Sequence, residues 1–143
     1  MENHTSYQII PESKLILTYF QGSITMKDLI QLNIKFIADK AYDSTFNLIM
    51  DFRDSTALAF KMDIADFFEF FKKNVSLKQK ILSGILYSTP NQKFLISFYI
   101  PTARLVNIHA EGFREINQCL DWMQYSAEEQ IKIKDALSSM KIK

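Results

Sequence analysis

The sequence contains few of the residues that build loops, disulfides or metal sites. Its 143 residues include three glycines, three prolines, two histidines and one cysteine. So little glycine and proline argues against a low-complexity or loop-dominated chain. The single cysteine, Cys119, excludes a disulfide within the chain and is typical of proteins kept in a reducing compartment. We therefore predict a cytoplasmic protein.

Charge of one sign and long apolar runs are also missing. Lysine and arginine number 17 against 16 acidic residues, a net charge of +1, whereas nucleic-acid-binding domains carry a basic face. No uncharged apolar run approaches the length of a membrane span, and the first residues lack the apolar segment of a signal peptide. We predict no nucleic-acid partner and no membrane span. The hydrophobic content of 48% suits one globular domain with its own core.

Apolar periodicity predicts an α/β domain. Residues 7–10 and 15–20 read as an antiparallel hairpin, and residues 21–23 break its second strand. Further strands are expected at residues 46–52, 81–87 and 104–109, and helices at residues 25–40, 63–74, 88–101, 112–125 and 126–140. Repeated strand–helix units imply parallel neighbours with helices on both faces. We predict one domain over residues 1–143: a mixed sheet of about five strands with the first antiparallel, a core at residues 7–125, and a peripheral helix at residues 126–140.

The motifs of common catalytic and cofactor sites are absent from the sequence. The glycines stand alone, so no phosphate-binding loop can form, and there is no Gly-x-Ser-x-Gly nucleophile motif. His109, near the end of an expected strand, is a candidate general base. Cys119 would need a lowered pKa to act as a nucleophile, and we interpret it as a core-filling thiol. We therefore predict no enzymatic activity, no cofactor and no metal site.

A polar cluster follows the apolar strand that is expected at residues 46–52. Asp51, Arg53 and Asp54 combine two carboxylates with a guanidinium at the carboxyl end of this strand. Such a group can bind a ligand or a partner, or it can form only surface ion pairs. Ser55 and Thr56 come next, which leaves a phosphorylation switch as a further hypothesis.

Phenylalanine is abundant, with 12 copies, and it concentrates in and around the second expected helix. Such residues can fill a core, line an apolar pocket or form a partner surface. We expect a partner-binding surface that comprises Asp51, Arg53, Asp54, Phe60 and Phe70. The alternative is a cleft for a small apolar or lipid-like ligand between the second and third helices, lined by Phe67, Phe71, Phe94 and Phe98.

The order of these segments resembles the SpoIIAA-like, STAS-type domains over residues 7–123. The resemblance rests on three segments: the hairpin end Phe20-Gln21-Gly22-Ser23-Ile24-Thr25, the strand with Asp51-Phe52-Arg53-Asp54, and Cys119-Leu120-Asp121-Trp122-Met123. It implies a small mixed sheet flanked by helices, a relation to the lipid-binding CRAL-TRIO fold, and a non-enzymatic regulatory role in signalling.

The resemblance does not extend to the phosphorylation site of the family. In its anti-sigma-factor antagonists a serine at the start of the second helix is phosphorylated, whereas this chain has Lys61-Met62-Asp63-Ile64 there. The phosphosite is therefore not carried onto Ser55. Our leading hypothesis is a regulatory protein-interaction domain, and the alternative is a carrier or sensor of an apolar ligand. Homodimerisation through an open sheet edge or a helix face is a further hypothesis.

Overall fold

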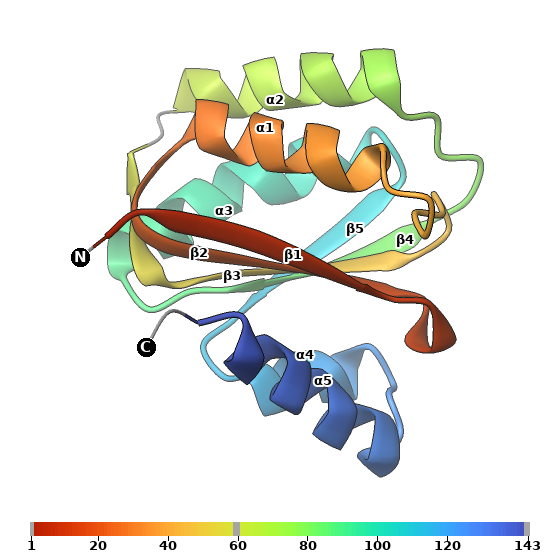
Figure 1. The fold of residues 1–143 in the computed structure, drawn as a ribbon. Coiled ribbons are helices and arrows are strands. Elements are labelled where there is room, and N and C mark those ends of the chain that lie inside the picture. The colour runs from red at the N-terminus through yellow and green to blue at the C-terminus, as the bar shows by residue number, and fades with distance from the viewer. Residues whose placement is uncertain (1, 59–60, 142–143) are drawn as a thin grey trace.

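The computed structural model, which describes residues 2–58 and 61–141, has a mixed five-stranded sheet (Figure 1). In this part of the chain the strands are β1 (His4–Ile10), β2 (Leu15–Thr25), β3 (Asn47–Leu58), β4 (Ile81–Leu86) and β5 (Ile108–Phe113), and they lie in that order across the sheet. Strand β1 is antiparallel to β2, and all later neighbours are parallel. The predicted fold class is confirmed.

Helices cover both faces of the sheet in two unequal layers (Figure 1). One layer consists of α1 (Met26–Ile37), α2 (Lys61–Asn74) and α3 (Pro90–Arg104), and the other of α4 (Ile116–Trp122) and α5 (Ala127–Ser139). A 3-10 helix, η1 (Pro11–Ser13), joins β1 to β2. Capping boxes begin α1, α3 and α5, with Thr25, Thr89 and Ser126 as the capping residues. Each hydroxyl satisfies a backbone N–H that the helix leaves free.

Strand β3 is the central strand and is covered on both faces. Leu48 and Met50 pack under α1, α2 and α3, whereas Ile49 packs with the side chains of α4 and α5. All three are buried, which explains the continuous apolar run in the sequence. The two faces therefore hold two separate apolar cores.

Strand β2 does not end at residues 21–23, as the sequence predicted. The register of β2 against β3 shifts between Tyr19 and Gln21, and pairing then continues to Thr25. Gly22 adopts φ +85° beyond this bulge, a conformation that glycine reaches without strain. The bulge lets the strand continue where a break was expected.

Helix α3 does not stop at Pro101, which lies inside it. Proline removes one helical hydrogen bond, but Tyr99 and Ala103 on either side of it are both buried against the sheet. The chain then turns at Asn107, which has φ 67°. The fifth strand consequently begins at Ile108 rather than at residue 104, and the helix expected at residues 112–125 is confined to α4.

Helix α5 is more deeply packed than a peripheral helix. The sequence suggested sparse apolar contacts, yet Ile133, Leu137 and the following Met140 are all buried. They join Leu17 and Ile49 of the sheet in one apolar cluster. Three apolar residues at helical spacing are enough here because α4 is short and leaves part of this sheet face to α5.

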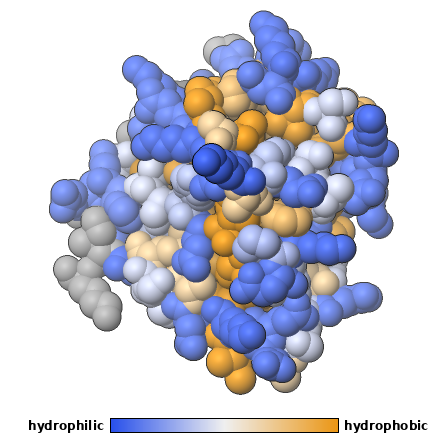
Figure 2. All heavy atoms as spheres, turned by 45° about the vertical axis from the view of Figure 1, so that its right-hand side comes forward, coloured by the Kyte–Doolittle hydropathy of each residue, from blue (hydrophilic) through white to orange (hydrophobic). Residues whose placement is uncertain are grey.

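Most side chains on the face shown in Figure 2 are hydrophilic. On the face in Figure 2 they surround a narrow band of apolar residues. The large apolar side chains that are exposed in the described part of the chain are Ile34, Phe94, Leu105 and Ile131. Among the helices described, none has the length and apolar character needed to cross a membrane.

The packing of α4 on β4 yields a stability prediction. A Cβ at Gly84 would overlap Sγ of the buried Cys119. Gly84→Ala should therefore lower the free energy of unfolding by about 1–3 kcal/mol through overpacking. Adding Cys119→Ala should recover much of this loss, and urea denaturation of both single variants and the double variant measures the coupling. Simple addition of the two single effects would contradict the predicted contact.

Candidate functional site

The sheet divides at its carboxyl edge, because β3 continues after its pairing with β4 has ended. Strand β3 pairs with β4 only from Leu48 to Asp51. Its pairing with β2 continues to Leu58. The sequence predicted the end of this strand at residue 52, since the next residues are polar. Beyond Asp51 one side of β3 has no strand neighbour, and side chains supply its hydrogen bonds instead.

Asp51 and Arg53 form a bidentate ion pair at this division. Oδ1 of Asp51 accepts hydrogen bonds from Nε and from the backbone N–H of Arg53, at 3.0 and 3.1 Å, and Oδ2 accepts from Nη2 at 3.0 Å. Asp51 is fully buried, and the Arg53 side chain is 23% exposed. The hydrogen bonds to Asp51 raise the pKa of Arg53 above its ordinary value. Asp51 thus fixes Arg53 at the surface and offers no face to a partner itself.

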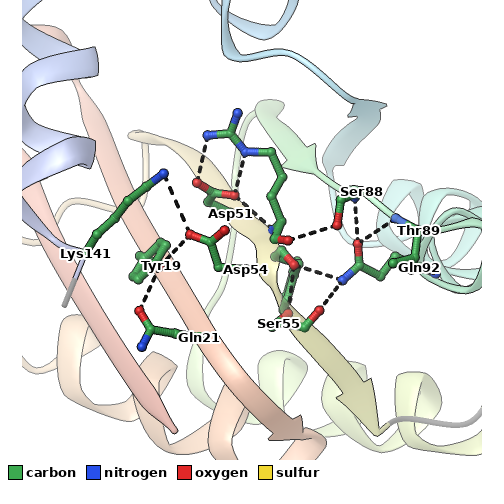
Figure 3. A network of polar contacts seen from close by, with 11 residues as sticks. Tyr19, Gln21, Asp51, Asp54, Ser55, Ser88, Thr89, Gln92 and Lys141 are labelled. Atoms are coloured by element: carbon green, nitrogen blue, oxygen red, sulfur yellow. Dashed lines mark hydrogen bonds and ion pairs between the residues drawn. The ribbon is translucent and has the colours of Figure 1, made fainter. Parts of the chain in front are cut away.

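Asp54 belongs to a second cluster, with Tyr19, Gln21 and Lys141 (Figure 3). The Tyr19 hydroxyl donates to Oδ2 of Asp54 at 2.6 Å and lies 3.0 Å from Oε1 of Gln21. Nζ of Lys141 lies 3.7 Å from the same Asp54 oxygen. Burial and the bond to Asp54 raise the pKa of Tyr19 well above its ordinary value, so the hydroxyl stays protonated. This cluster connects Lys141, the last residue that the structure describes, to the carboxyl edge of the sheet.

Gln92 on α3 bridges the free side of β3 (Figure 3). Its Nε2 donates to the carbonyl oxygens of Phe52 and Ser55, both at 2.8 Å. Its Oε1 accepts from the backbone N–H groups of Ser88 and Thr89, at 2.8 and 3.3 Å. All four hydrogen-bonding positions of the amide are therefore occupied.

Ser88 adds one more hydrogen bond between β3 and the segment before α3. Its Oγ donates to the carbonyl oxygen of Arg53 at 2.9 Å. Nη1 of Arg114 approaches the carbonyl oxygen of Ser88 at 3.5 Å, and its guanidinium lies over the ring of Tyr87. We call the polar groups that reach the surface at this edge, some of them half-buried, the tip surface: Arg53, Asp54, Ser88, Arg114 and Lys141.

An apolar pocket of about 90 Å³ lies directly beside Gln92. Strands β2, β3 and β4 form its floor, and α1, α2 and α3 form its walls. Its lining residues are Ile24, Thr25, Met26, Leu29, Met50, Phe52, Ile64, Ile85, Gln92, Leu95, Ile96 and Tyr99. None of them is ionisable except Tyr99, whose hydroxyl is buried.

The pocket is not formed by the phenylalanines that the sequence suggested for a ligand cleft. Phe67 and Phe71 are buried core residues. Phe94, 59% exposed, contacts Phe98 edge to face on α3. None of these four lines the pocket described above, which instead includes the neighbouring Phe52.

The residues expected at a partner surface lie in different places. Arg53 approaches Glu115 and Cys119, beside the layer of α4 and α5. Phe70 is half-buried on α2, in the opposite layer, and contacts Phe67. Phe60 lies outside the described residues. The polar cluster and Phe70 therefore do not lie side by side.

The isolated candidates for catalysis are not brought together. His109 is the second residue of β5, at the amino edge of the parallel strands, whereas the sequence placed it near a strand end that faces the opposite edge. Cys119 is fully buried, and burial raises its thiol pKa to about 12. His4 contacts the carbonyl oxygen of Met140. Among the described residues no group of side chains has the arrangement of a metal site.

The residues of this site that sequence reasoning missed are Gln92, Ser88, Tyr19, Gln21, Arg114 and Lys141. One signal was available: Gln92 follows Thr89 by three residues, the spacing of a capping box. That spacing predicts the bonds from Gln92 to the start of α3. The sequence has no feature that would reveal its bonds to Phe52 and Ser55, because these depend on the division of the sheet.

The comparisons with known proteins bear on the fold alone. No family model matches the chain, and no curated protein matches it in sequence. A solved structure from Shewanella loihica PV-4, described as an uncharacterized protein of the DUF3478 family with a SpoIIAA-like fold, is similar with a TM-score of 0.57. The similarity covers 85% of this chain and 95% of that one at 12% sequence identity. The chain thus has the SpoIIAA-like fold that the resemblance implied.

The ion pair at the tip yields a stability prediction. Asp51→Asn should cost about 2–4 kcal/mol of unfolding free energy, because it leaves the guanidinium without its charged partner. Arg53→Met should also destabilise, since it strands a buried carboxylate. The double variant Asp51→Asn/Arg53→Met should be more stable than the two losses added together. Lys141→Ala, which removes an exposed pair, is the control and should change stability by less than about 0.5 kcal/mol. Additive losses in the double variant would refute the coupling.

The buried thiol yields a prediction about alkaline stability. Because folding raises the pKa of Cys119 from its ordinary 9.0 to about 12, the folded chain binds more protons than the unfolded chain in that interval. Stability should therefore fall as pH rises above 9, by about 1 kcal/mol at pH 10. Cys119→Ala should remove this part of the loss, whereas the loss that comes from tyrosines with a raised pKa, which begins about one pH unit higher, should remain in the variant. Urea denaturation of wild type and Cys119→Ala at pH 8, 9 and 10 tests this prediction. If the free energy of unfolding depends on pH identically in the two proteins, the prediction is wrong.

Proposed function

We propose that this chain is a non-enzymatic regulatory domain that binds a protein partner through the tip surface. The observation that supports this most is the fixed arrangement of polar groups where β3 leaves β4. Arg53 is held by a buried carboxylate, Asp54 by a buried hydroxyl, and the main chain by Gln92 and Ser88. Groups fixed before binding lose little conformational entropy on association.

The charges at the tip surface favour a partner with both signs of charge. Arg53, Arg114 and Lys141 are cationic, and Asp54 and the nearby Glu115 are anionic. Mixed charges of this kind fix the orientation of a partner and exclude surfaces of one sign. A cytoplasmic signalling role, which the lone cysteine and the fold suggest, is part of this proposal. Fold alone does not carry it, because SpoIIAA-like structure can be inherited without function.

A carrier or sensor of an apolar ligand is the second candidate function. The apolar pocket beside Gln92 favours it, since ligand sites are concave and mostly apolar. The phenylalanine cleft expected from the sequence is replaced in this proposal by the residues that line the pocket.

A matched pair of charge reversals tests the interaction surface. Arg114→Glu changes an exposed residue of the tip surface, and Arg104→Glu makes the same change at the end of α3, near the opposite edge of the sheet. Partners captured by wild-type protein in extracts of its own organism should bind Arg114→Glu at least about tenfold more weakly, as expected for the loss of a charge-assisted contact. Arg104→Glu should bind as wild type does.

Phe70→Ala separates this surface from the one on α2. Equal capture by wild type and Arg114→Glu, with loss in Phe70→Ala, would refute the tip surface and support the α2 surface. A second copy of the chain counts as a partner here, and light scattering of the purified protein detects it.

A further inference from the structure

We propose that the pocket beside Gln92 binds an unbranched aliphatic chain and that its occupancy changes the tip surface. The regulatory half of this inference rests on the proposed interaction surface, whereas binding of the aliphatic chain does not. Four observations support the proposal. They are the apolar lining, the hydrogen bonds that Thr25 and Gln92 already make within the chain, the size of the pocket, and the two residues that connect the pocket to the tip surface.

The pocket is lined mostly by apolar side chains. Its polar lining residues are Thr25, Gln92 and Tyr99. The buried hydroxyl of Tyr99 has no hydrogen-bond partner among the described residues, and its polar neighbour is Ser83, which does not line the pocket. Thr25 is committed to the capping box with Asp28, and the amide of Gln92 makes four hydrogen bonds within the chain. A polar group of a ligand would lose its hydration here, and among the lining groups described the Tyr99 hydroxyl alone is left to compensate it. The buried part of the ligand is therefore hydrocarbon.

The small size and the solvent-exposed border of the pocket favour a chain, part of which can stay outside, over a rigid ring that must enter whole. At about 90 Å³ it is smaller than the cavity of ~150 Å³ that accommodates benzene in an engineered protein core. Thr25, Met26 and Leu95 at its border keep solvent exposure. A short aliphatic segment can thus fill the interior while a polar head group remains in water.

A second, smaller pocket differs from the pocket beside Gln92 in its size and in its polar lining. It measures about 20 Å³, and its lining includes the buried Asn33. Oδ1 of Asn33 has no hydrogen-bond partner among the described residues. That size and that free acceptor suit a single water molecule. The pocket beside Gln92 is larger, and apart from Tyr99 no residue of its lining has such a free group, so hydrocarbon suits it better than water does.

Phe52 and Gln92 connect the pocket to the tip surface. Both line the pocket, and Gln92 donates to the carbonyl oxygen of Phe52, the residue before Arg53. It also holds Ser55 and the N–H of Ser88. A ligand that displaces either side chain must shift the main chain between Phe52 and Ser55, and with it Arg53 and Asp54.

Titration of the whole chain with 1-hexanol, followed by ¹H–¹⁵N NMR, tests the proposal. Shifts should saturate, and cross-relaxation should connect the hexanol methyl group to the side chains of Met50 and Ile85. The amides of Arg53, Ser55 and Ser88 should shift, whereas that of Ile133 in the opposite core should not. 1-Butanol should bind more weakly than 1-hexanol, because each methylene adds buried apolar area. Benzene should bind more weakly as well.

Leu95→Trp, within α3, and Leu105→Trp, at the C-terminal cap of α3, are the matched variants. Leu95 lines the pocket, whereas Leu105 is 81% exposed and does not. Leu95→Trp should weaken hexanol binding by about tenfold, the equivalent of about two buried methylene groups. Leu105→Trp should leave it unchanged. The cross-relaxation in wild type keeps the test decisive even if Leu95→Trp does not fold.

The possible outcomes separate the two halves of the inference. Shifts that do not saturate, equal binding by both tryptophan variants, or stronger binding of benzene would overturn the aliphatic site. Saturable binding without shifts at Arg53, Ser55 and Ser88 would overturn the link to the tip. Neither result depends on the capture experiment with Arg114→Glu, so failure of the proposed partner surface remains distinguishable.

Discussion

Beyond Asp51, strand β3 keeps β2 as its neighbour on one side and has lost β4 on the other. An unpaired carbonyl group that is buried costs free energy comparable to a lost hydrogen bond. Gln92 and Ser88 remove this cost for Phe52, Arg53 and Ser55. The position of α3 against the sheet, the half-buried position of Arg53 and one wall of the pocket all depend on these few bonds.

The layers follow from the order of the strands. Because β2 to β5 are parallel and consecutive, three crossovers of one hand place α1, α2 and α3 on the same face. Three helices that share one face leave a pocket between them over the carboxyl half of the strands. The other face is left to α4 and α5. This explains why α5 buries Ile133 and Leu137 although its sequence has few apolar residues.

The fold could be predicted from the sequence further than the site could. Apolar runs and helical spacing located the strands and helices, and the helices expected at residues 25–40 and 126–140 do begin at their capping residues, Thr25 and Ser126. The local sequence did not predict where β2 and β3 end, because their length is decided by pairing between segments that lie far apart in the chain. Both strands extend through polar residues because each supplies the hydrogen bonds of the other. For the same reason the local sequence did not predict the hydrogen bonds from Gln92 to Phe52 and Ser55. The phenylalanines misplaced the pocket because composition does not tell a buried Phe67 from a lining Phe52.

The energies at this edge suit regulation by a small ligand. A hydrogen bond within a protein contributes a net ~1 kcal/mol, and burial of each methylene contributes about 0.8 kcal/mol. A ligand shifts an equilibrium only by the difference in its affinity for the two states. A few methylene groups in the pocket therefore match the one or two bonds of Gln92 that would have to change. The Asp51–Arg53 pair, buried and bidentate, is stronger than these bonds. Any movement at the tip should accordingly carry this pair as a unit and alter its position relative to Ser88.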